Sequence, residues 1–156
     1  MSAFRRFLAA TAFAFWMGGF TFYAAVVIPT AHGVLGSHRE VGFITQQVTR
    51  WLNLSAVVAL ALLAWQFFAG RAALPLARRR WLLATLAVMA LAQAALFIEH
   101  PMLDGLLDGE NQTIASGAHF YSLHRVYLLT AAVQWLAAML HAWAWLRADA
   151  QKPQTI

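Results

Sequence analysis

The chain has 156 residues, of which 62% are hydrophobic and only 11% are charged, whereas a soluble domain carries about 25% charged residues. This composition excludes an ordinary water-soluble domain, a disordered chain and a nucleic-acid-binding protein, and the lack of cysteine excludes disulfides, thiolate metal sites and cysteine catalysis. The net charge of +5 comes from 11 basic and 6 acidic residues. In a membrane protein such an excess encodes orientation rather than a choice of ligand.

Four long apolar stretches dominate the sequence. Each holds roughly 18–23 residues, enough for a helix to cross a hydrocarbon core of about 30 Å. Because a bilayer offers no water to exposed backbone groups, we predict an all-α integral membrane protein. Its expected architecture is an up-down-up-down four-helix bundle, formed as a single domain over residues 1–156. The predicted spans are 7–29, 52–70, 81–98 and 124–146.

The ends of the first two helices carry local signals. The first stretch follows two arginines, as a secretory signal would, but it is too long and lacks a cleavage site, so we expect a retained helix. Pro29 and Gly33 predict its end. Ser37 and Glu40 then stand in the S-x-x-E spacing of a capping box. The second helix should therefore begin near residue 38, outside the bilayer.

Charged residues sort by connection. Eight of the eleven basic residues flank the two termini and the second connection, which by the positive-inside rule places both termini in the cytoplasm. We expect a multi-pass protein of the bacterial inner (cytoplasmic) membrane. Five of the six acids and five of the six histidines fall on the outer side. The inner basic residues are Arg5, Arg6, Arg71, Arg78, Arg79, Arg80, Arg147 and Lys152, and the outer groups are Glu40, Glu99, Asp104, Asp108, Glu110, His32, His38, His100, His119 and His124.

Polar residues recur on single helix faces. Gln46, Arg50 and Asn53 follow i, i+4, i+7 spacing, and Gln93 and His100 lie seven residues apart. Polar groups are costly in hydrocarbon, so these faces should point into the bundle. The stripes predict a pocket open to the outside and sealed below by Leu, Ala and Trp. Its expected residues are Tyr23, Arg50, Asn53, Gln93, His100, His124 and Tyr127.

The histidines suggest a metal site as one of two readings. His32, His100 and His124 are expected near the outer ends of three helices, at similar depth, and imidazoles suit copper, iron or zinc, or the axial positions of a haem. The alternative is that these histidines are wetted at the membrane interface, since no H-x-x-x-H spacing is present.

Two further groups of residues leave alternatives open. Arg50, with Glu99 or Asp104, could anchor an anionic or quinone-like ligand, or it could form an ion pair that ties the second helix to the third connection. His124 and Tyr127, three residues apart, are candidates for a catalytic proton-transfer pair. Equally, they are residue types of the interfacial belt. Tyr23, Asn53 and Gln93 are the other candidates for holding a cofactor.

Several motifs resemble those of known membrane families. Four features resemble those of small four-helix membrane proteins grouped with anthrone oxygenases. They are the glycine-bearing first helix that runs from Gly18 to Pro29, the Gln46–Gln47 pair followed by Asn53, the stretch 101–104, and His124–Arg125. This resemblance implies an oxygenase-type reaction on an apolar aromatic substrate. Trp16, Gly18 and Gly19 are also similar to the Trp-x-Gly-Gly of copper-resistance-D-like membrane domains, which implies a metal.

Two functional hypotheses follow. The first is a redox or oxygenase-like protein that binds a transition metal, a haem or an apolar aromatic molecule in the outer pocket. The second is a non-catalytic accessory or assembly subunit of a membrane complex. The expected partners are the lipid bilayer, an apolar small molecule, and either a second copy of the chain or another membrane protein; no nucleic acid is expected.

Overall fold

The computed structural model describes residues 3–108, 113–114 and 116–150, so Glu110 and Lys152, which entered the charge argument, lie outside the described residues. In chain order the elements are α1 (Ala3–Phe22), the π-helix η1 (Tyr23–Val27), α2 (Ile28–Leu35), α3 (His38–Gly70), the 3-10 helix η2 (Arg71–Ala73), α4 (Leu76–Asp104), the strands β1 (Leu107–Asp108) and β2 (Thr113–Ile114), and α5 (Gly117–Ala150). The two strands form a short antiparallel pair.

Four helical segments of the described chain are long and apolar enough to cross a membrane: Ala3–Leu35, Glu40–Gly70, Leu76–Asp104 and Gly117–Arg147. Many large apolar side chains on them face outward, among them Phe15 at 74% and Leu91 at 72% exposure. An outward apolar surface on long helices is the pattern of a protein whose solvent is lipid. The structure therefore confirms an all-α protein, apart from the small strand pair, and indicates a multi-pass membrane protein.

The first helix does not end where the sequence predicts. A proline inside an α-helix clashes with the carbonyl four residues earlier and cannot donate a hydrogen bond. The turn before Pro29 accommodates this by widening into η1, where the Ile28 N–H donates to the Tyr23 carbonyl, five residues back. The helix then continues as α2 to Leu35 and ends at Gly36, whose φ of 62° is left-handed. The prediction that Pro29 and Gly33 end this helix is wrong.

The start of α3 depends on a side-chain cap. Ser37 is the N-cap residue, and its hydroxyl oxygen accepts a hydrogen bond from the Glu40 N–H at 3.3 Å. The helix begins at His38 and runs unbroken for 33 residues. It is longer than the predicted apolar span because a capped helix can continue beyond the hydrocarbon.

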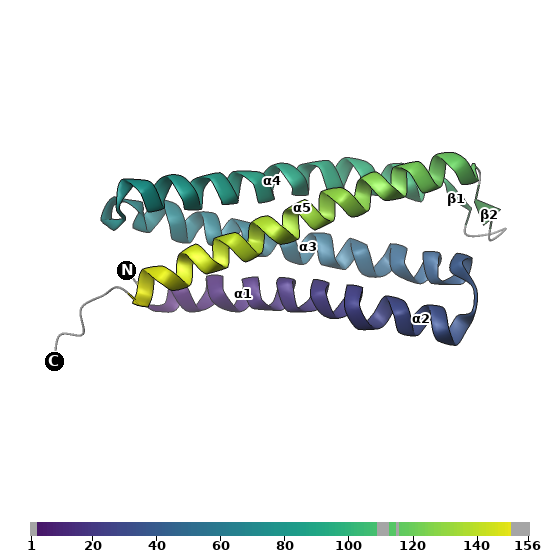
Figure 1. Ribbon diagram of the computed structural model, residues 1–156, viewed down its shortest axis with the longest axis horizontal. Coiled ribbons are helices and arrows are strands. Elements are labelled where there is room, and N and C mark those ends of the chain that lie inside the picture. The colour runs from purple at the N-terminus through teal and green to yellow at the C-terminus, as the bar shows by residue number, and fades with distance from the viewer. Residues whose placement is uncertain (1–2, 109–112, 115, 151–156) are drawn as a thin grey trace.

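The long helices lie side by side along the longest axis of the molecule (Figure 1). Helix α1 packs against α3, α3 against α4, and α4 most extensively against α5. The beginning of α1, η2 and the end of α5 gather at one end, which we call the arginine end because it carries Arg5, Arg71 and Arg147. The opposite end, with α2, the strand pair and the start of α5, carries His32, His100 and His124, and we call it the histidine end.

The two ends are packed differently. Toward the arginine end a large cluster of buried apolar side chains fills the bundle, with Leu63 and Met89 at 2% and 0% exposure. Toward the histidine end a smaller cluster holds Leu96, Leu103, Tyr127 and Ala131. The buried apolar core is therefore concentrated toward the arginine end, and the histidine end has room for a large cavity.

Candidate functional site

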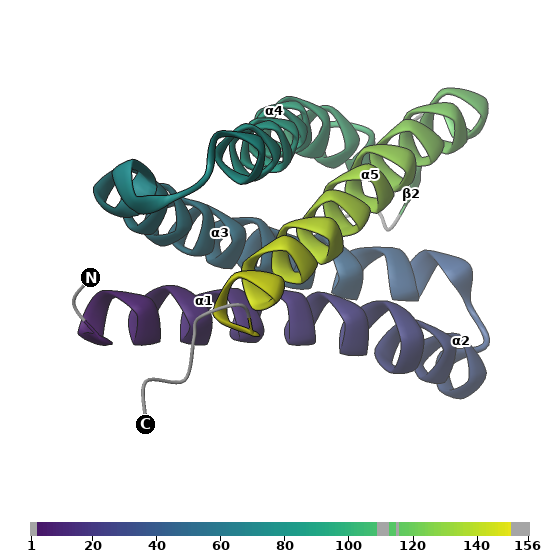
Figure 2. The ribbon, with the colours of Figure 1, turned by 60° about the vertical axis from the view of Figure 1, so that its left-hand side comes forward.

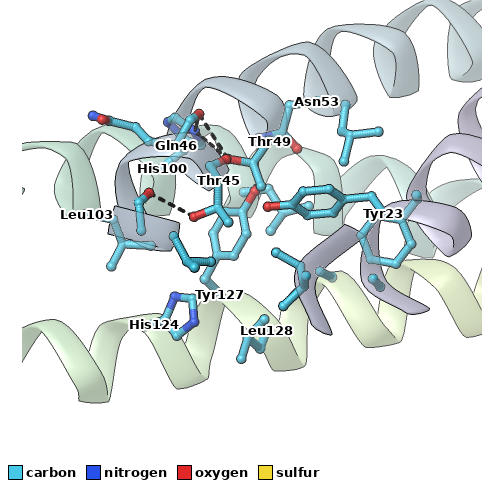
Figure 3. A pocket seen from close by; sticks show the side chains of 18 of the residues that line it. Tyr23, Thr45, Gln46, Thr49, Asn53, His100, Leu103, His124, Tyr127 and Leu128 are labelled. Carbon is cyan, nitrogen blue, oxygen red and sulfur yellow. Dashed lines mark hydrogen bonds between the residues drawn. The ribbon is translucent and has the colours of Figure 1, made fainter. Parts of the chain in front are cut away.

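A cavity of about 1040 Å³ lies in the histidine half of the bundle. Its walls are mostly apolar, with side chains such as Phe20, Ile28, Leu96 and Leu103. Polar side chains from η1, α3, α4 and α5 point into it, and Figure 3 shows Tyr23, Thr49, His100 and Tyr127 around the same space. A large apolar cavity with a few convergent polar groups is the usual form of a small-molecule site. The polar lining residues are Thr21, Tyr23, His32, Ser37, Thr45, Gln46, Thr49, Asn53, His100, Asp104, Tyr121, His124, Tyr127 and Gln134.

The structure brings together six of the eight sequence-predicted site residues. Tyr23, His32, Asn53, His100, His124 and Tyr127 all line the cavity. The π-turn places Tyr23 there: it is the first residue of η1, is 8% exposed, and points its hydroxyl toward Thr45 (Figure 3). The other two predicted residues, Arg50 and Gln93, do not line the cavity.

Arg50 is predicted to point into the pocket, but it is not among the residues that line this cavity. Its side chain is exposed, and within the described parts of the chain it forms no ion pair with Glu99 or Asp104. The cavity face of α3 is centred on Thr45, Thr49 and Asn53, which repeat every fourth residue. Arg50 follows Thr49 directly, so it is turned away by about 100°, the rotation per residue of an α-helix. Of the two alternatives for Arg50, the ion pair is not formed among the described residues, and the ligand anchor stays a prediction.

Gln93 lies behind the cavity wall in a buried chain of amides. Its side-chain N–H donates to Asn53 Oδ1 at 3.4 Å, and its own oxygen accepts from Gln134 Nε2 at 2.9 Å. Gln134 also donates to the backbone carbonyl of Met89, and Asn53 Nδ2 donates to the Tyr127 hydroxyl oxygen at 3.2 Å. These amides link α3, α4 and α5, and Gln93 is thus a positioning residue for Asn53 and Tyr127.

His100 is held on both of its ring nitrogens. Nδ1 lies 3.0 Å from Asp104 Oδ2, one turn further along α4, while Nε2 lies 3.1 Å from Thr49 Oγ1 and 3.3 Å from the Gln46 carbonyl oxygen. Each of these partners offers an acceptor atom, since the Thr49 hydroxyl itself donates to the Thr45 carbonyl at 2.7 Å. A ring engaged in this way ties α4 to α3, and both of its nitrogens face protein partners.

The threonines of α3 are the functional residues that sequence reasoning missed. Thr45 and Thr49 line the cavity and lie beside Tyr23 and Tyr127 (Figure 3). Their hydroxyls donate to backbone carbonyls of the preceding turn, at 2.8 Å for Thr45 to Gly42. The Thr49 oxygen also lies 3.1 Å from His100 Nε2, and the Tyr23 hydroxyl points toward Thr45. Their fourth-residue spacing with Asn53 was the available signal.

His124 lines the cavity with a ring that forms no hydrogen bond to a described residue. It stacks on Phe120 with the ring planes 6° apart and the centroids 5.8 Å apart. No hydrogen bond joins it to Tyr127, which instead accepts from Asn53, and none joins its ring to any other residue that the structure describes. The proposed proton-transfer pair is therefore not formed in this conformation. Both side chains face the same cavity, so a ligand could contact them together.

The metal hypothesis gains no support from this geometry. His32, His100 and His124 all line the cavity. However, across residues 3–108, 113–114 and 116–150 no group of three or more His, Asp or Glu side chains is placed to hold a metal ion. The physical reason at His100 is the engagement of both nitrogens by Asp104 and α3.

Other polar groups lie away from the cavity and form pairs within the bundle, although Gln66 Nε2 and Glu99 Oε2 are buried without a hydrogen-bond partner among the described residues. His141 Nδ1 lies 2.8 Å from the Thr85 hydroxyl, and Arg5 donates to Gln66 Oε1 at 2.8 Å near the arginine end. The Thr130 hydroxyl donates to Glu99 Oε1 at 3.0 Å, joining α5 to α4. These pairs connect neighbouring helices, which is the usual role of polar side chains inside a membrane bundle.

Comparison with known protein families, with characterised proteins and with solved structures finds no match. The resemblance to anthrone-oxygenase-like and copper-resistance-D-like proteins, which rests on short motifs, stays a prediction.

Proposed function

We propose that the protein binds an apolar aromatic molecule that carries a hydroxyl or carbonyl group, in a cavity that opens toward the outside of the membrane. The observation that supports this most directly is the convergence of Tyr23, Asn53, His124 and Tyr127 in one mostly apolar cavity of about 1040 Å³. A ring system fits such walls, while the polar side chains fix its orientation. An oxygenase-type or other redox reaction on that molecule is the further step implied by the resemblance.

Hydrogen-bonding capacity supports a polar end on the ligand. Tyr127 Oη accepts from Asn53, so its own proton is free to turn toward Thr49 or toward a ligand oxygen. The unengaged ring of His124 can exchange a hydrogen bond with a ligand hydroxyl on another side of the cavity. A pure hydrocarbon would leave these groups unpaired, which costs free energy in an apolar setting.

A binding measurement tests the proposal. With the protein in lipid nanodiscs, 2-naphthol should bind at least tenfold more tightly than naphthalene, which has the same ring system and no hydroxyl. Tyr127→Phe should lower the affinity for 2-naphthol by about tenfold, the value of roughly one hydrogen bond of 1.4 kcal/mol. The affinity for naphthalene should stay unchanged. The measurement is isothermal titration against empty nanodiscs; equal binding of the two probes, or none, contradicts the proposal and favours the accessory-subunit hypothesis.

We further propose an up-down-up-down arrangement in the bacterial inner membrane, with both termini and the arginine end in the cytoplasm. The charge asymmetry supports it, because arginines at membrane interfaces mark the inner side. Three of them cover aromatic rings near that end: Arg5 lies 5.9 Å above Trp65, Arg71 5.2 Å above Phe68, and Arg147 4.5 Å above Trp143. Such pairs are typical of the interfacial belt.

Single cysteines test this orientation cleanly, because the natural chain has none to give background labelling. Ser116→Cys, exposed before α5 at the histidine end, should react with a membrane-impermeant maleimide in intact spheroplasts. Ala72→Cys, exposed in η2 at the arginine end, should react only after the membrane is permeabilised. The reverse pattern would show the opposite orientation.

A further inference from the structure

One side of the cavity is open between helices. Helices α1 and α5 pack only loosely against each other, and neither η1 nor α2 packs closely against α5 in the described structure. Figures 1 and 2 show the same arrangement: α5 approaches α1 near its C-terminal end and diverges from η1 and α2 toward the histidine end. The other three sides of the cavity are bounded by packed helix pairs.

The edges of this opening are exposed residues that also line the cavity. On the first helix they are Thr21, Ala24 and Ala25, and on α5 they are Leu128, which is 52% exposed, and Ala132. Their exposure, together with the loose packing of α1, η1 and α2 against α5, indicates that the cavity meets the outer surface here. We call this gap, bounded by these five residues, the lateral opening.

The lateral opening lies within the apolar part of the bundle. Its edges belong to helical segments that are apolar enough to span a membrane, so lipid chains face it. Three of its five residues are alanines, whose small side chains keep the gap wide. Toward the arginine end it is closed by a hydrogen bond of 3.0 Å from the Trp135 indole N–H to Thr21 Oγ1.

The cavity is therefore polar on one side and joined to lipid on another. Asn53 and Tyr127 are buried, at 7% and 8% exposure. The edge residues Leu128 and Ala132 come after Tyr127 in the sequence and lie on an exposed face of α5. A molecule with a polar ring and a hydrocarbon chain satisfies both environments at once. Its ring would bind the polar groups, and its chain would leave between η1 and α5 without being exposed to water.

Building on the proposed function, we propose that the ligand is a lipid-dissolved amphiphile, an aromatic ring bearing a hydroxyl or carbonyl on a long hydrocarbon chain, and that the chain occupies the lateral opening. The test compares 2-naphthol with 2-naphthol bearing a twelve-carbon chain at position 6, both expressed as concentrations in the lipid. Ala132→Phe places a bulky ring in the lateral opening. It should weaken binding of the long-chain probe at least tenfold and that of 2-naphthol less than twofold.

Ala94→Phe is the matched control, because Ala94 is exposed on α4 and does not line the cavity. It should change neither affinity. Equal losses for both probes in Ala132→Phe, or unchanged binding of the long-chain probe, would overturn the proposal for the lateral opening. Failure of the unaltered protein to bind either probe would instead contradict the proposed function, so the two failures are distinguishable.

Discussion

Leu63→Ala should destabilise the bundle by about 2 kcal/mol. Leu63 is 2% exposed and lies in the large apolar cluster toward the arginine end. In water-soluble proteins a buried Leu→Ala change costs about 2–5 kcal/mol, part of which is the loss of transfer from water. In a bilayer the separated helices already hold this side chain in hydrocarbon, so the transfer part cancels and mainly the packing loss remains. We therefore expect the loss of unfolding free energy to lie at the lower end of the range found in water-soluble proteins.

Leu91→Ala is the control for this change. Leu91 lies on α4 and is 72% exposed, so lipid already surrounds its side chain. Its replacement should alter the free energy of unfolding by less than about 0.5 kcal/mol. The measurement is reversible unfolding in mixed micelles with increasing sodium dodecyl sulfate, followed by circular dichroism. Equal changes in the free energy of unfolding for Leu63→Ala and Leu91→Ala would mean that Leu63 is not packed in the core of the folded protein.

Gln93→Leu should also destabilise the bundle, by about 1–2 kcal/mol, although it replaces a polar residue with an apolar one inside a membrane protein. Asn53 Oδ1 would lose its donor and Gln134 would lose one acceptor, and both groups are buried. An unsatisfied buried polar group costs about 1–3 kcal/mol, and measured hydrogen bonds between membrane helices reach about 1.7 kcal/mol. The same unfolding measurement applies.

Two comparisons show whether the amide chain is responsible. Gln47→Leu changes an exposed glutamine on α3 and should have little effect or a slightly stabilising one. Replacing Asn53, Gln93 and Gln134 together with leucine removes the donors and acceptors at once, and should cost less than the sum of the single changes. A stabilising Gln93→Leu would show that these amides do not pair in the folded protein.

The four membrane-length helices could be predicted from the sequence because hydrocarbon thickness dictates the length of an apolar run. The beginning of α3 could be predicted too, since the cap at Ser37 depends on residues three apart. The end of the first helix could not. A proline either ends a helix or is accommodated in a widened turn. Which of the two occurs depends on how far contacts beyond the proline stabilise a longer helix, and the presence of Pro29 alone does not show this.

The candidate site was partly predictable for a similar reason. Placing Asn53, His100 and Tyr127 near one another needed only helical periodicity and the cost of polar groups in lipid. Excluding Arg50 from the cavity lining would require knowing which face of α3 points inward, and this is set by the packing of the helices. Thr45 and Thr49 share the fourth-residue spacing of Asn53, but their hydroxyls can bond to their own helix in any surroundings, so this spacing alone does not separate a cavity face from a lipid face.

The widened turn η1 makes the first helix tolerant of a change in chain length at this one place. It closes over one residue more than a regular turn, with the Ile28 N–H reaching back to Tyr23 rather than to Ala24. If one of the alanines in this turn were deleted, Ile28 would stand four residues after Tyr23, and the same hydrogen bond would become that of a regular α-helix. The helix beyond would keep its orientation relative to α1, and His32 would stay at the cavity wall. A deletion within the regular helix α1 would instead rotate everything beyond it by about 100°. A single-codon deletion in η1 would therefore remove a side chain without changing the phase of the helix.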